Sequence, residues 1–476
     1  MILRPSRVLA LRGLTCAAAV LAGSAQAQPL PAACPGAGPI YAPFGMADFN
    51  PADVGTPMLR HTLGGANSRC NDGSQAVMYI RPADAWYSGP QLPQNAIKRE
   101  RWVIFFEGGG GCHDADSCLA RWCSLPGTSI FERAGKMSTL GAYDAVFAPS
   151  GIFSRNPALN DFAGYNQVFL YYCSSDNWIG SNSLAGVVPG AGPSYDIQFQ
   201  GEAIVNDAFA ELAAGGVGGD AGPAALFYNT ALPALSTAEE VVLAGESAGG
   251  GGLRHHVDRL RNFILTQAPG ARVAALIDAG AAPGLWDPAI NWAASPWADY
   301  DDYLNTQVAA SLAFWGANAS ALDASCQAPA FAAAHNAVGV HPTICGDTTY
   351  TLLNHITTPF FLRMDIGDTL ADDKYFDYTF YPSGQAYHAA LFNQLAALAV
   401  SPGGLEPFVA APRVYGPYCG QHVAVQTSNG FFVHHVNPAG NSFHDLFETW
   451  LHAGGLGDQI QVDGNPTPVY TPSFCP

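Results

Sequence analysis

A serine flanked by glycines offers the clearest chemistry in the sequence. Ser247 lies in the segment Gly-Glu-Ser-Ala-Gly-Gly that runs from Gly245 to Gly250, directly after the apolar run 241–244. A stretch compatible with a helix follows, and a strand, tight turn and helix in this order present a serine hydroxyl as a nucleophile. The glycines supply backbone dihedrals that other residues avoid, and the helix N-terminus favours developing negative charge. We therefore predict a nucleophile at Ser247 rather than an ordinary Gly-rich turn.

A second Gly-rich segment precedes the serine motif. Gly108–Gly111 directly follow the apolar run 102–106. A tetrahedral intermediate of acyl transfer carries a negative charge on oxygen, and each preorganised N–H donor to it contributes about 3–4 kcal/mol. We expect the backbone N–H groups near Gly109, Gly110 and Ala248 to form such an oxyanion hole. A phosphate-binding loop is disfavoured, because no Lys-Ser or Lys-Thr pair ends the segment.

A serine nucleophile also needs a general base and a carboxylate that orients the base. In the strand–turn–helix arrangement the chain order is Ser, then Asp, then His. Asp365 and Asp368 come just after the apolar run 360–364, and the longer reach favours Asp368 as the acid. Asp278, which ends the run 273–277, is the alternative, and it could equally cap a helix or bond to a loop.

The candidates for the base are the histidines near the C-terminus: His422, His434, His435, His444 and His452. We favour His444, which follows a loop after a predicted strand at 431–433 and opens a helix-like stretch at 445–451. His435, at the end of that predicted strand, is the main alternative. The histidine would take the proton from the serine, and the aspartate would fix its tautomer and support the imidazolium.

Elements that could position these groups alternate along the chain. Short apolar runs without polar alternation indicate buried strands. They are residues 76–80, 102–106, 168–172, 241–244, 273–277, 360–364 and 431–433. Helical stretches are expected at 203–212, 253–265 and 386–399. This alternation predicts an α/β fold with a mostly parallel central sheet and helices on both faces. Functional groups in such folds lie beyond the carboxyl ends of the strands.

Residues 282–351 interrupt the alternation and contain no clear strand. They hold a group of large aromatic residues: Trp286, Trp292, Trp297, Tyr300, Tyr303 and Trp315. These rings could simply fill a helical core, or they could line an acyl or sugar pocket. We predict that the segment is a helical cap inserted into a single catalytic domain that spans residues 28–476.

The first 27 residues have the pattern of a signal peptide. Arg4, Arg7 and Arg12 precede an apolar stretch at 14–22, and Ala-Gln-Ala ends at Ala27. The apolar stretch is shorter than the ~20 residues that a membrane-spanning helix needs. No lipidation motif precedes Cys34, so no stable membrane anchor is expected. The sequence predicts cleavage near Ala27 and release to the periplasm or the extracellular space.

The charge of the chain excludes some partners. The formal net charge is -18, and the predicted leader contains three arginines and no acid, so the mature chain would carry about -21 (-18 minus 3). Its lysines are Lys98, Lys136 and Lys374. Nucleic acids and anionic membranes are bound through clustered Lys and Arg, so neither is expected as a partner. The sequence contains no information on oligomeric state.

Cysteine usage agrees with export. Of the 11 cysteines, Cys16 lies in the leader, which leaves Cys34, Cys70, Cys112, Cys118, Cys123, Cys173, Cys326, Cys345, Cys419 and Cys475. In an oxidising compartment disulfides are the favoured interpretation, and Cys326–Cys345 is a plausible local pair. His113 beside three cysteines suggests zinc, but the spacings are not of the paired CxxC type. No metal or cofactor is predicted.

Several motifs resemble the pectin acetylesterase family, which includes Notum-like carboxylesterases. Phe-Glu-Gly-Gly begins at Phe106 with Cys112 and Cys118 behind it, and Ile-Asp-Ala-Gly begins at Ile277. The serine motif also matches. The most specific segment is Tyr-Cys-Ser-Ser-Asp-Asn-Trp-Ile-Gly at 172–180. Together these motifs cover roughly residues 101–280, and weaker similarities lie near the predicted acid and base.

This resemblance implies an α/β-hydrolase fold with an oxyanion loop at the double glycine and a Ser-Asp-His triad. By position the triad would be Ser247, Asp368 and His444. The sequence departs from the family at Gly110, where an aromatic residue is usual, and at Glu246, where a small residue or Cys is frequent. The C-terminal histidine region also differs in length. The family removes acetyl groups from pectin or a fatty acyl group from a signalling protein.

Three functions are compatible with these patterns. The leading hypothesis is a secreted serine carboxylic-ester hydrolase that deacetylates a polysaccharide such as pectin through an acyl-enzyme. An acyl or lipid esterase, or a polyester depolymerase, would instead require a larger apolar pocket. A non-catalytic binding protein on a hydrolase fold is the third hypothesis, and an intact triad argues against it.

Overall fold

The computed structural model describes the chain in segments. They are residues 56–86, 91–123, 134–139, 142, 146–220, 229–281, 308–317, 321–328, 343–346, 350–352, 355–365, 367–368, 413–417, 419–433, 441–452 and 460–462. The predicted leader (1–27) and helix (386–399) lie outside these residues. So do most of the predicted cap (282–351) and, of the six aromatic residues named above, all but Trp315. The leader and the division into domain and cap therefore stay predictions.

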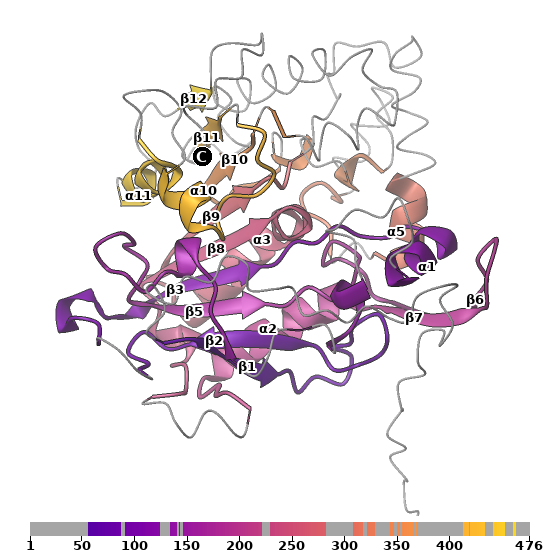
Figure 1. Cartoon of the computed structure of the whole chain (residues 1–476), viewed down its shortest axis with the longest axis horizontal. Coiled ribbons are helices and arrows are strands. Elements are labelled where there is room, and N and C mark those ends of the chain that lie inside the picture. The colour runs from indigo at the N-terminus through magenta and orange to yellow at the C-terminus, as the bar shows by residue number, and fades with distance from the viewer. Residues whose placement is uncertain are drawn as a thin grey trace, which may run out of the picture.

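A ten-stranded sheet forms the centre of the molecule (Figure 1), with strand order β12-β11-β10-β9-β8-β3-β5-β2-β1-β4. The strands are β1 (Met58–Thr62), β2 (Val77–Arg81), β3 (Lys98–Phe106), β4 (Val146–Phe147), β5 (Tyr165–Leu170), β8 (Glu240–Glu246), β9 (Arg272–Asp278), β10 (Phe360–Arg363), β11 (Arg413–Gly416) and β12 (Ile460–Val462). From β5 to β12 every neighbouring pair is parallel, whereas β2, β1 and β4 add antiparallel pairs at one edge. The expected mostly parallel sheet is thus present.

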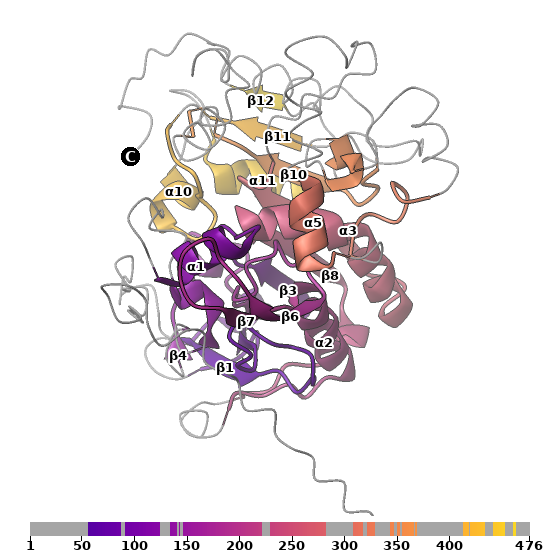
Figure 2. The same cartoon turned by 90° about the vertical axis from the view of Figure 1, so that its right-hand side faces the viewer.

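Helices cover both faces of this sheet. They are α1 (Ala115–Cys123), α2 (Gly201–Ala214), α3 (Ala248–Gln267), α5 (Ala309–Trp315), α10 (Ser428–Val433) and α11 (Phe443–His452). Short 3-10 turns occur at Gln94–Ala96, Ala134–Met137, Gly151–Phe153, Leu235–Thr237 and Ile344–Gly346, and β6 (Asn182–Val187) pairs with β7 (Tyr195–Phe199) in a separate hairpin. Helices α2 and α3 lie on one side of the sheet and α10 on the other (Figure 2).

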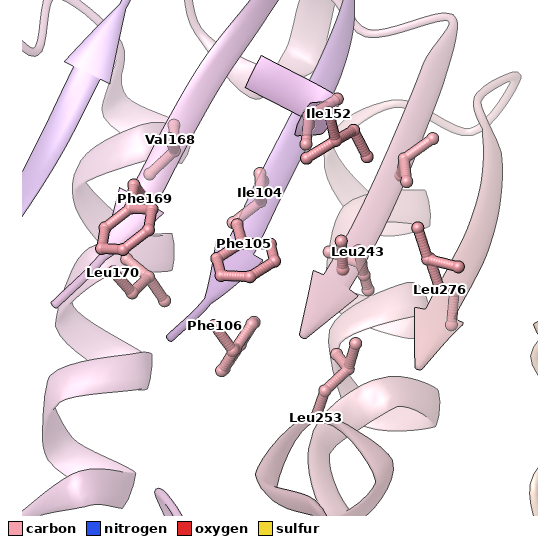
Figure 3. Packing of buried hydrophobic residues seen from close by; sticks show 14 of the residues in the cluster. Ile104, Phe105, Phe106, Ile152, Val168, Phe169, Leu170, Leu243, Leu253 and Leu276 are labelled. Carbon is pink, nitrogen blue, oxygen red and sulfur yellow. The ribbon is translucent and has the colours of Figure 1, made fainter. Parts of the chain in front are cut away.

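Alternation along the strands divides the core between the two faces. On β3, the Phe106 ring lies 6.5 Å from Phe209 of α2, whereas its neighbour Phe105 stacks on Phe169 at 5.4 Å. On β10, Phe361 lies 5.5 Å from Phe447 of α11. Figure 3 shows the packing of β3, β5, β8 and β9 side chains near Leu253 of α3. Burial on both faces explains why these strands read as continuous apolar runs.

All the predicted strands except the last overlap observed strands, and the helices expected at 203–212, 253–265 and 445–451 overlap α2, α3 and α11. The strand predicted at 431–433 is wrong, because these residues end helix α10. The Phe431 ring lies 5.2 Å from the Phe443 ring of α11. The place beside β10 in the sheet is taken instead by β11, which the sequence did not predict. A run of three apolar residues has no periodicity that distinguishes strand from helix.

Disulfides account for every cysteine in the described part of the chain. Bonds join Cys70 to Cys173, Cys112 to Cys118 and Cys326 to Cys345, and Cys123 and Cys419 are also disulfide-bonded. The predicted pair Cys326–Cys345 is confirmed. The zinc interpretation is wrong, because the three cysteines near His113 are oxidised. Among the helices of the described segments, none is both long and apolar enough to cross a membrane.

Helix α3 is tied to the segment after β5 by a buried histidine. The Nε2 atom of His256 lies 2.7 Å from the carbonyl oxygen of Trp178, and its Nδ1 atom lies 2.8 Å from a guanidinium nitrogen of Arg259. The neutral ring therefore donates through Nε2–H and accepts at Nδ1. Burial, with a smaller contribution from the Arg259 charge, lowers the pKa of His256 to about 3.

This pKa predicts a loss of stability in acid. Below about pH 6.5 His256 is protonated in the unfolded chain but stays neutral in the folded protein. Because the unfolded state binds the extra proton, the free energy of unfolding falls as the pH falls. We expect His256→Gln, whose amide can donate and accept without titrating, to remove about 2 kcal/mol of the loss between pH 7 and pH 5. Guanidinium unfolding of both proteins at the two pH values measures this difference. An equal loss in both proteins would contradict the prediction.

Candidate active site

The candidate site lies at the carboxyl edge of the parallel strands. Ser247 directly follows β8, and the Gly-rich loop Gly108–Gly111 follows β3. Asp368 comes after β10, and the loop with His422 comes after β11. Because these strands are parallel, their carboxyl ends meet at the same edge of the sheet. Residues that are distant in sequence therefore converge around one serine.

Ser247 stands at a sharp turn between β8 and α3. Its backbone has φ 49° and ψ -124°, a conformation that costs a non-glycine residue free energy and is found at constrained functional sites. The Ser247 N–H donates to the carbonyl oxygen of Asp278 at 2.8 Å. A Cβ atom on Gly249 would lie 2.6 Å from the carbonyl oxygen of Glu107, and one on Gly250 would lie 2.9 Å from Cα of Gly280. Only glycine permits this close crossing of strand, helix and loop.

A histidine and an aspartate form a chain of hydrogen bonds that begins at the serine hydroxyl. The Nε2 atom of His422 lies 2.8 Å from Ser247 Oγ, and its Nδ1 atom lies 2.6 Å from Asp368 Oδ2. Asp368 is fully buried. A carboxylate can only accept, so Nδ1 carries the proton toward Asp368 and leaves Nε2 free to accept the serine proton. The order Ser247, Asp368, His422 along the chain is the order expected for this arrangement.

His444 is not part of this arrangement, so its prediction as the base is corrected. It lies on α11, which covers a face of the sheet, and its ring is 5.3 Å from Phe431 and 6.1 Å from Phe162. Its Nε2 atom is 3.5 Å from a carboxylate oxygen of Asp161. The side chain thus packs in an aromatic layer. His435, the other favoured candidate, lies outside the described residues.

The sequence contained one signal for His422. The residues Arg-Val-Tyr-Gly at 413–416 form β11, a parallel neighbour of β10. His422 is the first histidine after this strand. Had 413–416 been identified as a strand, His422 would have been the histidine expected at the carboxyl edge.

The Gly-rich loop lies directly against the serine turn. A Cβ atom on Gly108 would lie 2.6 Å from the carbonyl oxygen of Glu246 and 2.9 Å from Cβ of Ser247. Gly109 and Gly110 have φ values of 137° and 67°, which favour glycine. Gly108 thus lies beside the serine turn, and the next two residues have a conformation that other residues rarely adopt.

A buried ion pair between Lys136 and Glu107 fixes the start of this loop. The Lys136 ammonium contacts Glu107 Oε1, and Glu107 Oε2 accepts the backbone N–H of Tyr172 at 2.9 Å. The Lys136 Nζ atom also lies 5.1 Å from the centre of the Tyr171 ring. The indole N–H of Trp178 donates to the Glu107 carbonyl oxygen at 3.1 Å. These contacts fix the residue that immediately precedes the four glycines.

The motif at 172–180 is mainly a structural brace. Asp176 is fully buried and accepts from the hydroxyl of Ser174 at 2.6 Å and from the backbone N–H groups of Trp178 and Gly201 at 3.0 and 2.9 Å. Burial raises the pKa of Asp176 to about 6 although these hydrogen bonds oppose the shift. The segment turns sharply, with positive φ at Ser175, Asn177 and Trp178, and it packs on the Gly-rich loop and on α3.

Glu246, beside Ser247, is almost fully buried. The side-chain amide of Gln426 donates to its Oε1 atom, which links the serine turn to the segment after His422. Burial, together with the negative charges of Asp278 and Glu107, raises the pKa of Glu246 well above its usual value. This residue is one of the departures from the family pattern, and burial disfavours the charged form of its carboxyl group.

For Asp278 and Asp365, considered as alternative acids, the side-chain hydrogen bonds lead to Arg363 and to backbone N–H groups. Asp278 accepts from Arg363 and from the backbone N–H groups of Ala424 and Val425.

The described residues contain no cluster of three or more His, Cys, Asp or Glu side chains that could hold a metal ion.

Gly108→Ala tests the contact between loop and serine turn. The added methyl group would meet backbone atoms that cannot rotate away, so we expect the loop to shift, with a loss of about 1–3 kcal/mol of stability from overpacking. Thermal unfolding and labelling of Ser247 by an organophosphonate measure the two effects. Gly270→Ala is the matched control, because a Cβ atom there meets nothing within 4 Å. Unchanged labelling of the Gly108 variant would contradict the proposed contact.

The family model described as pectinacetylesterase matches residues 52–283. Palmitoleoyl-protein carboxylesterase NOTUM of Drosophila melanogaster is 27% identical over 216 residues, which cover 45% of this chain and 26% of that protein. NOTUM of Homo sapiens is 27% identical over 222 residues, which cover 46% of this chain and 35% of that protein. The chain thus spans well under half the length of these curated relatives.

The fold has a counterpart among solved structures. The structure of the Wnt deacylase Notum from Drosophila superposes with a TM-score of 0.61 at 21% identity, over 88% of this chain and 100% of that one. This likeness establishes the α/β-hydrolase fold predicted from the motifs. The resemblance noted in the sequence is confirmed: over residues 52–283 the chain matches the pectinacetylesterase family.

Proposed function

We propose that the protein is a serine carboxylic-ester hydrolase with Ser247 as nucleophile, His422 as base and Asp368 as the carboxylate that orients the base. The observation that carries the proposal is the continuous chain of contacts from Ser247 Oγ to His422 Nε2 at 2.8 Å and from His422 Nδ1 to Asp368 Oδ2 at 2.6 Å. His422 takes the serine proton as Oγ attacks the ester carbonyl, and it returns the proton to the leaving alcohol. Water then hydrolyses the acyl-enzyme by the same route.

In this proposal, backbone N–H groups of Gly109, Gly110 and Ala248 stabilise the oxyanion. The glycine loop touches the serine turn at Gly108, and Ala248 begins helix α3, whose N-terminus favours negative charge. Donors fixed in position before the reaction need no rearrangement as the charge develops. The Glu107–Lys136 pair and the Trp178 indole supply that rigidity.

The substrate class we propose is an acetylated polysaccharide such as pectin, met outside the cytoplasm after removal of the leader. The match to the pectinacetylesterase family supports this choice. The second candidate is a longer acyl ester, favoured by the likeness to palmitoleoyl-protein carboxylesterases. Gly110, at the position where the family usually has an aromatic residue, leaves no side chain over that part of the loop.

Replacement of the histidines separates the two assignments of the base. We expect Ser247→Ala and His422→Ala each to lower kcat for p-nitrophenyl acetate on the order of a million-fold with folding retained. His444→Ala should lose stability through its aromatic contacts and keep kcat within about threefold of the wild type. Circular dichroism and steady-state kinetics measure both properties. If His444→Ala were inactive and His422→Ala active, the proposed base would be wrong.

Acyl length separates the two substrate classes. We expect kcat/KM on p-nitrophenyl esters to be highest for acetyl and to fall steeply toward palmitoyl, because a site for acetylated sugars needs little acyl volume. Acetate release from pectin and from xylan, measured in parallel with Ser247→Ala as the blank, tests the natural class. Activity that rises with chain length would instead favour the longer acyl ester.

A further inference from the structure

A fully buried arginine lies behind the catalytic histidine. Arg363 ends β10, and its register partner on β9 is Asp278. Its Nη1 atom donates to Asp278 Oδ1 at 2.9 Å, and its Nη2 atom lies 3.3 Å from Asp365 Oδ2. All three side chains are 0% exposed. The proposed mechanism uses none of them directly, so their cost of burial calls for another explanation.

The remaining contacts of these side chains lead to the backbone around His422. Arg363 donates from Nη1 to the His422 carbonyl oxygen at 2.7 Å and from Nη2 to the Gln421 carbonyl oxygen at 2.9 Å. The guanidinium thus uses each terminal nitrogen twice, once for a carboxylate and once for a carbonyl group of the loop. Its planar shape suits this fourfold contact, which a lysine cannot reproduce.

The two carboxylates hold the loop on either side of the histidine. Asp365 accepts the backbone N–H groups of Cys419, Gly420 and Gln421 at 2.9, 3.2 and 3.0 Å. Asp278 accepts those of Ala424 and Val425 at 2.6 and 2.8 Å. Hydrogen bonds to ionised acceptors are stronger than neutral ones. Seven backbone groups of the segment 419–425 therefore bond to one buried cluster.

We propose that Asp278, Arg363 and Asp365 are positioning residues that fix the imidazole of His422 between Ser247 and Asp368 by clamping the backbone of residues 419–425. The inference rests on the proposed function, because it assigns the cluster to the base of that reaction. The hydrogen bonds described above join the three side chains to the backbone of residues 419–425, whereas the His422 ring bonds to Ser247 and Asp368. The cluster acts only through the backbone from which the ring projects.

The geometry also explains why this clamp is needed. The segment 419–425 contains no helix or strand, so its own backbone pairing cannot fix it. A displacement of the ring by about 1 Å lengthens both bonds of the catalytic chain and can cost on the order of 100-fold in rate. A rigid cluster anchored on β9 and β10 transmits the stiffness of the sheet to the loop.

Asparagine replacement of the carboxylates tests the proposal. Every neighbour of Asp278 named above is a hydrogen-bond donor, so the amide of Asp278→Asn must face at least one of them with its own N–H groups. We expect Asp278→Asn and Asp365→Asn each to lower kcat about 10- to 100-fold, with KM changed less than about threefold. If one variant fails to fold, the other carries the measurement.

Asp258→Asn is the matched control. Asp258 on α3 is likewise a carboxylate that accepts hydrogen bonds from donor groups. The donors are the backbone N–H and hydroxyl groups of Thr357 and Thr358, at 2.5–2.9 Å. It has no contact with the segment 419–425 in the described part of the chain. We expect this variant to lower the melting temperature and to leave kcat unchanged. A fall in kcat equal to that of Asp278→Asn would indicate a general loss of structure and overturn the proposal.

A double-mutant cycle with His422→Ala gives the decisive measurement. If Asp278 acts only through the histidine, adding Asp278→Asn to His422→Ala will cause no further loss of residual p-nitrophenyl acetate hydrolysis. A multiplicative loss in the double variant, or an unchanged kcat in Asp278→Asn alone, overturns the clamp. Full activity of His422→Ala would instead overturn the proposed function, so the two failures are distinguishable.

Discussion

Backbone contacts around Ser247 leave no room for side chains, and the arrangement of the site depends on that constraint. Gly108 approaches the Glu246 carbonyl oxygen, Gly249 approaches the Glu107 carbonyl oxygen, and Gly250 and Gly280 touch each other. The glycine loop can therefore reach the serine, and α3 can begin directly after it. A run of glycines at the start of a helix costs about 1 kcal/mol per residue relative to alanine. Close packing of α3 on β8 and β9 offsets this cost.

Buried carboxylates fix the conformation of glycine-rich and irregular loops, which do not form regular backbone hydrogen bonds of their own. Two loops at the carboxyl edge of the sheet are held by acids that accept backbone N–H groups. Glu107 and Asp176 hold the segment after β5, and Asp278 and Asp365 hold the segment after β11. Regular elements pair their own backbone groups, whereas buried loops need side-chain partners. The acidic composition of the chain thus contributes to the rigidity of the site as well as to its surface charge.

The sequence predicted the parts of the site that depend on local interactions and missed the part that depends on contacts between distant residues. Ser247 and the glycine loop were identifiable because a tight turn after a buried strand leaves a local pattern. His422 was not, because the four residues of β11 are a weak local signal and the strand is established by its pairing with β10, a contact between residues about 50 positions apart. The apolar residues at 431–433 were mistaken for that strand, although their partners are the aromatic rings of α11. The choice of His444 followed directly from this error.

The resemblance to the family likewise covers only part of the candidate site. The matched region, residues 52–283, contains Ser247, the glycine loop and Asp278, whereas Asp368 and His422 lie beyond it. Asp278 connects the two parts, because its backbone carbonyl oxygen accepts the Ser247 N–H and its carboxylate accepts backbone N–H groups next to His422. One residue thus bonds to Ser247 through its main chain and to the segment that carries His422 through its side chain. Asp278, in the motif Ile-Asp-Ala-Gly, therefore connects the region that matches the family model with the segment that carries His422.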